Sequence, residues 1–199
     1  MDCKKHLSGY VLTTLAIAGG LCISARAQVA NGPWTSESPT YNLQLVGSGW
    51  NSGSQFGITS TSTTTEQRAE RRYQSFSTGT HQFEGYVTVN SLGGDRISLK
   101  QTFQDGTGPW TMIAVSKSGY LYAVENGDHL ANYTVGSNVR INTICYTSST
   151  KDAIWINGSL IEYTMGGTPP YYHKFGTYRT SSGKGPVTAT WTNIKFWQK

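Results

Sequence analysis

The sequence predicts an all-β protein, and three observations support this prediction. Thr, Ser, Tyr and Gly are abundant, and no stretch keeps the 3.6-residue apolar period of an amphipathic helix. Short alternating polar and apolar segments recur instead, with turn residues between them at fairly regular intervals. One such turn, Asn157-Gly158, lies between two apolar runs and strongly indicates a β-hairpin. The simplest architecture for this pattern is a single-domain jelly-roll sandwich of two sheets.

The alternating segments also predict where the strands lie. The expected strands are Tyr41–Val46, Thr64–Gln74, His81–Asn90, Arg96–Phe103, Trp110–Ser116, Tyr120–Glu125, Val139–Tyr146, Asp152–Ile156, Ser159–Tyr163, Tyr171–Thr180 and Val187–Phe196. Before the second strand we expect a polar lead-in, up to about Thr40, and a long Gly/Ser/Thr-rich loop over Gly47–Ser62. Residues 28–63 thus hold the lead-in, first strand and loop, and residues 64–199 the rest of the domain.

The N-terminus has the pattern of a cleavable secretion signal. Two lysines precede an apolar run from Tyr10 to Ile23, and Ala25-Arg26-Ala27 follows as a small-x-small cleavage site. Residues 1–27 are therefore expected to be a signal peptide. A membrane anchor is the alternative, but the run is too short to span a bilayer. We expect the mature protein to be extracellular, or periplasmic if its source is bacterial.

The composition of the mature chain limits its partners. Cleavage leaves Cys145 as the one cysteine, so no internal disulfide can form, and we expect Cys145 to be a small buried residue. The formal charge falls from +5 to about +3, because the signal carries a net +2. This mild basicity suits an anionic partner. The absence of a Lys/Arg run or a recognised binding motif argues against nucleic acid.

The first candidate site segment is the strand that contains Arg68, Glu70 and Arg72. Side chains alternate along a strand, so these three share one face. An arginine on this face could bind a carboxylate bidentately, with Glu70 fixing the arginines. The alternative is a solvated face with cross-strand ion pairs.

The second segment carries Gln101. Alternation places Gln101 with Ile97, Leu99 and Phe103, so its amide would project from an apolar row and need a partner in the core or in a ligand. Lys100 is expected on the opposite, solvated face.

The third segment begins at Tyr172. Tyr172, Lys174, Gly176 and Tyr178 share one face, which offers an ammonium and two phenols, and the glycine is expected to leave room for something to approach. A nearby cation can lower the pKa of a phenol, and Tyr178 needs such help to act as a base. The alternative is a tyrosine-rich edge strand whose lysine extends to water.

Together the three segments resemble the alginate lyases of polysaccharide lyase family 7. That family is marked by R-x-E-x-R, by Q-I-H or Q-V-H, and by Y-F-K-A-G-x-Y-x-Q. The matching residues are Arg68, Glu70 and Arg72 in the first motif, Gln101 in the second, and Tyr172, Lys174, Gly176 and Tyr178 in the third. The resemblance extends from about Thr64 to Trp197 and implies a concanavalin A-like jelly roll. Related jelly-roll lyases cleave glucuronan, another uronate polymer.

The resemblance also implies a role for each matched residue. Arg68 and Gln101 would hold the substrate carboxylate, and Tyr178 would be the catalytic acid and also the base. Lys174, Glu70 and Arg72 would bind neighbouring sugars or orient the first set. Tyr172 would stack on the polysaccharide chain.

The sequence departs from the family at one catalytic position. Phe103 stands where the family has a histidine that shares proton transfer with the tyrosine. His81 is the candidate for a substitute base, because it opens the strand that follows Arg68–Arg72. His173 alternates away from Tyr178 and should face the opposite layer, and His129 is expected in a loop. Without a substitute, more of the chemistry falls to Tyr178.

These observations predict a secreted lyase that cleaves an anionic, uronate-containing polysaccharide of the alginate or glucuronan type by β-elimination. We expect it to act as a monomer, without cofactor or metal and without a membrane or nucleic-acid partner. The alternative is a non-catalytic, lectin-like jelly roll that binds carbohydrate. A structural cell-surface protein would also fit the composition, but it would leave the polar strand faces unexplained.

Overall fold

A computed structural model describes residues 32–61, 65–179 and 183–199, so the predicted signal peptide lies outside the described residues. The strands are β1 (Thr35–Glu37), β2 (Tyr41–Val46), β3 (Gly49–Ser52), β4 (Gln55–Ile58), β5 (Gln67–Tyr73), β6 (Thr80–Leu92), β7 (Arg96–Gln104), β8 (Gly108–Ser116), β9 (Tyr120–Ala123), β10 (His129–Asn132), β11 (Asn138–Tyr146), β12 (Lys151–Ile156), β13 (Ser159–Met165), β14 (Tyr171–Arg179) and β15 (Val187–Gln198). Within the same ranges no helix is long and apolar enough to cross a membrane.

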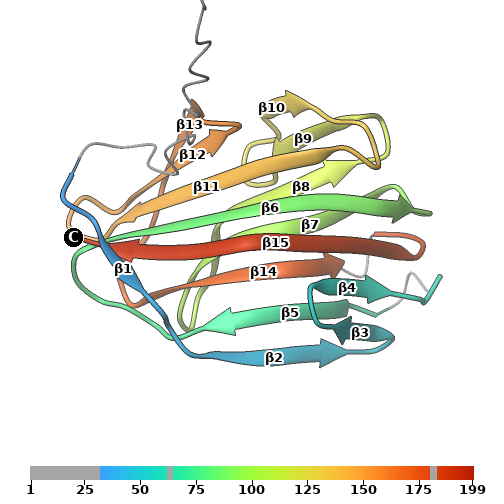
Figure 1. Ribbon diagram of the computed structural model, residues 1–199, viewed down its shortest axis with the longest axis horizontal. Coiled ribbons are helices and arrows are strands. Elements are labelled where there is room, and N and C mark those ends of the chain that lie inside the picture. Colours follow the sequence, from blue (N-terminus) through green and yellow to red (C-terminus); the bar gives the residue numbers. More distant parts are fainter. Residues whose placement is uncertain (1–31, 62–64, 180–182) are drawn as a thin grey trace, which may run out of the picture.

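The strands form two stacked antiparallel sheets (Figure 1). The 8-stranded sheet has the order β13-β12-β11-β6-β15-β4-β3, with β1 paired to β15, and the 7-stranded sheet has the order β10-β9-β8-β7-β14-β5-β2. Neighbouring strands are often far apart in sequence, as where β6 pairs with both β11 and β15. The predicted all-β jelly-roll sandwich is confirmed.

The core fills the space between the two sheets. Phe83 of the 8-stranded sheet packs against Phe175 of the 7-stranded sheet, with ring centroids 5.5 Å apart, and Trp191 contacts both rings. Buried Ile, Leu and Val side chains complete the cluster. Because alternate residues of each strand face this core, the other residues of the 7-stranded sheet are left for its outer face.

Two segments differ from the sequence-based expectation. The predicted Gly47–Ser62 loop contains the hairpin of β3 and β4, and the lead-in contains β1. Phe56 and Ile58 of β4 are buried in the core, which stabilises a hairpin whose Gly/Ser-rich sequence favours a loop. His129, expected in a loop, begins the short strand β10.

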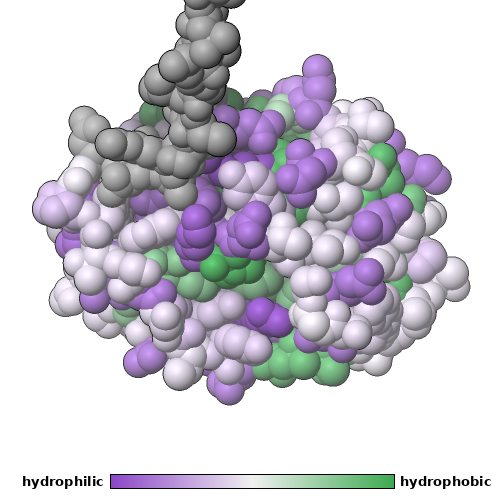
Figure 2. Space-filling view, viewed as in Figure 1, coloured by the Kyte–Doolittle hydropathy of each residue, from purple (hydrophilic) through white to green (hydrophobic). Residues whose placement is uncertain are grey.

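The sheet edges expose apolar side chains. On β2 these are Tyr41, Leu43, Leu45 and Val46, and on β13 they are Leu160, Ile161 and Tyr163. Figure 2 shows a green patch along the lower margin, over β2, where Leu43, Leu45 and Val46 are exposed.

Candidate functional site

The register of β14 brings the three candidate segments together. β14 lies between β5 and β7 in the 7-stranded sheet. The facing pairs are Tyr178–Arg68, Gly176–Glu70 and Lys174–Arg72 toward β5, and Lys174–Gln101 and Tyr172–Phe103 toward β7. The matched residues therefore gather on one face of one sheet, which we call the cleft face.

Glu70 lies at the centre of this group. Its side chain is fully buried; its Oε1 accepts a 2.6 Å hydrogen bond from Gln101 Nε2, and its Oε2 lies 3.2 Å from Arg68 Nε. Burial raises the pKa of the Glu70 carboxyl, although Lys174, Arg68 and the Gln101 hydrogen bond act in the opposite direction. Glu70 thus orients both the guanidinium and the amide that the resemblance assigns to substrate.

Tyr178 lies beside Arg68, whose guanidinium carbon is 4.8 Å from the centre of the phenol ring. Arg68 also pairs with Glu66 at 3.5 Å. The pKa of Tyr178 is raised, first by burial and then by Glu66, and Arg68 only partly offsets this. The nearby cation thus acts on this pKa in the expected direction, but the net shift is upward, because desolvation of the phenolate outweighs the attraction to the guanidinium.

Lys174 lies in a layer of aromatic rings. Its Nζ is 4.4 Å from the ring centre of Phe103 and 5.5 Å from that of Tyr172. Burial lowers the pKa of Lys174, while the charge of Glu70 raises it. Tyr172 is itself buried, stacked on Phe103 at 5.2 Å and contacted by the Arg72 guanidinium at 4.1 Å. These contacts leave little of the Tyr172 ring for the predicted stacking on a sugar.

A cavity of about 370 Å³ opens beside Tyr178. Its lining includes Arg96, Ser98, Met112 and Tyr122 from β7, β8 and β9. Tyr122 alternates with the buried Leu121 and Ala123, so the sequence pattern indicates that it points outward. The sequence pattern does not identify Arg96 and Met112 as lining residues, because nothing in their own segments marks them as part of a site.

The prediction for β7 is wrong at one point. Lys100, expected on a solvated face, is fully buried, and its Nζ donates to Gln101 O at 2.7 Å and to Thr102 Oγ1 at 3.3 Å. The pairing register with β8 shifts between Ser98 and Lys100, which reverses the alternation there. Gln101 accordingly faces Glu70 instead of continuing the buried row of Ile97 and Leu99. Burial lowers the pKa of Lys100 to about 7.

A glycine is needed at position 176 for a reason that differs from the expected one. It has a φ of 146°, and an added Cβ would lie 2.2 Å from the backbone oxygen of Ala69 and 2.8 Å from Glu70 Cα. The glycine is therefore required by the close approach of β5, and not by the approach of a ligand.

The structure does not bring His81 into this group. His81 belongs to β6 of the other sheet, where its ring contacts Glu37 and the backbone oxygen of Thr78. His173 is buried and faces the other sheet as predicted, with its ring centre 6.1 Å from that of Phe83. Cys145 is also buried as predicted, with its pKa raised by burial. No cluster of three or more His, Cys, Asp or Glu side chains suited to a metal ion occurs among the described residues.

No protein-family model and no curated protein matches this chain. Solved structures do match its fold. The alginate lyase AlgAT5 of polysaccharide lyase family 7 matches with a TM-score of 0.61 and 16% identity over 74% of this chain and 79% of that one. The alginate lyase from Corynebacterium sp. matches with a TM-score of 0.61 and 17% identity over 85% and 83% of the two chains. A sialidase also matches, with a TM-score of 0.58 and 9% identity, over 82% of this chain but 16% of its own length. The structural resemblance to alginate lyases is confirmed, and at these identities it concerns the fold.

Proposed function

We propose that the protein is a polysaccharide lyase that cleaves an anionic, uronate-containing polymer of the alginate or glucuronan type by β-elimination on the cleft face. The observation that carries this proposal is that one buried carboxylate holds both Arg68 and Gln101, while Tyr178 lies against Arg68 and borders a cavity of about 370 Å³. This arrangement uses the same residue types, in the same chain order, as the family motifs.

The chemistry explains why these groups would be needed together. β-Elimination removes the proton α to a uronate carboxylate, and the resulting dianion is too unstable in water to form quickly. Hydrogen bonds and a guanidinium directed at that carboxylate stabilise the developing charge. Gln101 uses one amide N–H for Glu70 and has a second, and a guanidinium carries five N–H donors. Arg68 and Gln101 can therefore serve substrate while Glu70 holds them.

Tyr178 carries the proton transfers in this proposal. Its raised pKa keeps the phenol protonated at neutral pH, which suits the acid that protonates the departing glycosidic oxygen. As the base, the same oxygen must first lose its proton, so the reaction is expected to be faster in alkaline solution. His81 takes no part, because it lies on the other sheet. We further propose, from the N-terminal pattern, that the protein works outside the cytoplasm.

An ultraviolet assay tests the proposal. Residues 28–199 are incubated separately with alginate, polyguluronate, polymannuronate and glucuronan, and absorbance of the unsaturated product is followed. Absorbance from at least one polymer is expected. If no polymer gives it while the protein still binds one of them in calorimetry, the lectin-like alternative is the correct one.

A further inference from the structure

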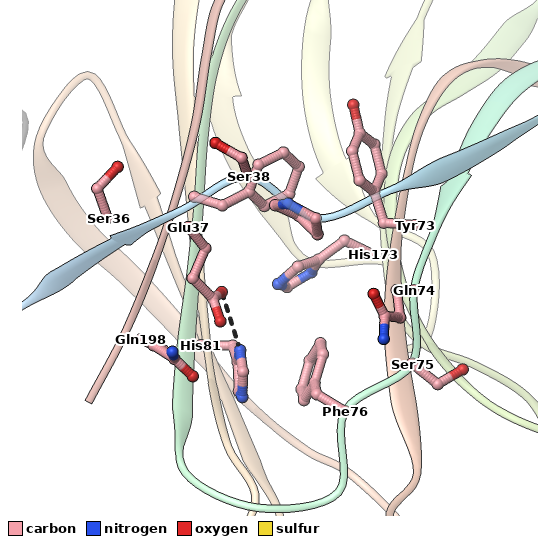
Figure 3. A pocket seen from close by; sticks show the side chains of 12 residues that line it. Ser36, Glu37, Ser38, Tyr73, Gln74, Ser75, Phe76, His81, His173 and Gln198 are labelled. Carbon is pink, nitrogen blue, oxygen red and sulfur yellow. Dashed lines mark hydrogen bonds and ion pairs between the residues drawn. The ribbon is translucent and has the colours of Figure 1, made fainter.

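A second hollow lies at the end of the sandwich where β1, the start of β6 and the end of β15 meet (Figures 1 and 3). We call it the end pocket. Its volume is about 370 Å³, and its lining includes Glu37, Tyr73, Phe76, His81, His173 and Gln198. None of its lining residues borders the cavity beside Tyr178. On β14, His173 and Tyr178 are separated by about 17 Å along the strand, at about 3.3 Å per residue.

His173 supplies an unpaired polar atom to this pocket. The residue is 3% exposed, and its Nδ1 lies 3.2 Å from Lys100 Nζ, whereas its buried Nε2 has no hydrogen-bond partner. Figure 3 shows the ring of His173 directed into the pocket, toward Glu37 and His81. A buried polar nitrogen without a partner costs free energy, so a ligand that pairs with it gains affinity.

Glu37 and His81 form the opposite wall. His81 Nδ1 lies 3.2 Å from Glu37 Oε2, and His81 Nε2 lies 2.9 Å from Thr78 O. The ring of His81 is thus held between the Glu37 carboxylate and the backbone oxygen of Thr78. Burial and the nearby Lys100 hold the pKa of His173 well below its usual range, which keeps this ring neutral. The pocket lining thus holds one carboxylate and no lysine or arginine, unlike the cleft face with Arg68, Arg72 and Lys174.

The remaining lining combines apolar ring faces with small polar groups. Phe76 stacks on His81 with centroids 3.9 Å apart, and Tyr73 packs on Phe196 at 4.5 Å. Serine and glutamine side chains line the pocket beside these rings. Aromatic rings next to convergent polar groups match the C–H faces and the hydroxyl groups of a pyranose.

We propose that the end pocket binds an uncharged polyhydroxylated ring of the neutral pyranose class. A hydroxyl group both donates and accepts, so it satisfies His173 Nε2 whichever ring nitrogen carries the proton. A carboxylate only accepts, and it would meet the carboxylate of Glu37. The site is separate from the cleft face, and its occupancy does not depend on lyase activity.

Ligand-observed NMR and calorimetry on residues 28–199 test this proposal. The probes are the methyl glycosides of glucose, mannose and xylose, with glucuronate as the charged comparison. Ser38→Trp places a large ring at the rim of the pocket, and Glu37→Gln removes the carboxylate without changing its shape. Tyr178→Phe is the matched control, because Tyr178 does not border the pocket.

At least one neutral glycoside is expected to bind and to resist displacement by glucuronate. Its affinity should fall about tenfold or more in both pocket variants, as expected from the loss of about 1.4 kcal/mol, and should be unchanged in Tyr178→Phe. The proposal is overturned if no neutral glycoside binds the folded protein. It is also overturned if both pocket variants bind as the wild type does, or if glucuronate competes equally.

Discussion

Glu70 and Gln101 share a 2.6 Å hydrogen bond although β14 lies between their strands. The residue of β14 that faces Glu70 is Gly176, which has no side chain to separate them. The glycine thus permits both the close approach of β5 and the contact that orients Gln101. The predictions below test this arrangement and the chemistry proposed for it.

Tyr178→Phe is expected to abolish product absorbance, because it removes the one oxygen proposed to carry both proton transfers. Polymer binding should persist, since the ring and its contact with Arg68 are retained. The assay compares initial rates and calorimetric affinities with those of Tyr163→Phe, an exposed tyrosine on the other sheet. A Tyr178→Phe protein with wild-type rates would remove Tyr178 from the mechanism.

Glu70→Ala is expected to destabilise the fold by about 3–5 kcal/mol, because it leaves Arg68 and Gln101 without their buried partner. Urea unfolding followed by fluorescence measures the change. Glu66→Ala is the matched control: it removes the exposed carboxylate partner of the same arginine and should cost less than about 1 kcal/mol. Equal effects in the two variants would contradict the central role given to Glu70.

Gly176→Ala is expected to cost more than about 3 kcal/mol, since its Cβ would clash with the backbone of Ala69 and Glu70. Gly106→Ala is the control. Gly106 also has a positive φ, of 76°, but open space surrounds its Cβ position, so only about 1 kcal/mol is expected there. Thermal unfolding distinguishes the two, and similar melting temperatures would argue against the close approach of β5.

The buried Lys100 predicts a pH-dependent stability. Its folded pKa of about 7 lies below its value of 10.5 in the unfolded chain, so the unfolded state binds more protons between these values. The free energy of unfolding should therefore rise with pH between about 7 and 10, by up to about 1.4 kcal/mol per unit. Urea titrations at several pH values measure this slope. Lys100→Met should lack it, and a variant with the wild-type slope would show that another group is responsible.

A tyrosine base with a raised pKa predicts that activity increases with pH. The phenolate fraction grows about tenfold per unit below the pKa, so the rate should climb steadily from neutral to alkaline solution. Phe103→His adds an imidazole beside Tyr172 and Lys174. An ordinary imidazole has a pKa near 6.5, far below that of a phenol. We expect the rate optimum of this variant to move toward neutral pH.

Phe103→Leu is the control for that shift, because it changes the packing without adding a base. Its rate profile should keep the wild-type dependence on pH. If Phe103→Leu and Phe103→His gave the same profile, the added imidazole would play no part in the proton transfer.

The sequence by itself determined most of the strands, though not β1, β3, β4 or β10, and the faces of two of them. Alternation along β5 predicted that Arg68 and Glu70 lie on the same side of their strand, and alternation along β14 predicted the same for Lys174 and Tyr178. Pairing of the two strands places all four on the cleft face. Alternation also predicted that His173 faces the other layer, and the residue type predicted that Cys145 is buried; both side chains are buried. These features depend on the geometry of a single strand, which neighbouring residues reveal.

Only the tertiary structure decided how these faces meet. The register shift in β7 turned Lys100 inward and Gln101 toward Glu70. The close approach of β5 is what requires a glycine at position 176. Burial outweighed the nearby cation and raised the pKa of Tyr178. The end pocket joins Glu37, His81 and His173 from three distant segments. Strand pairing and desolvation depend on residues remote in sequence, so no single segment contains the information that fixes them.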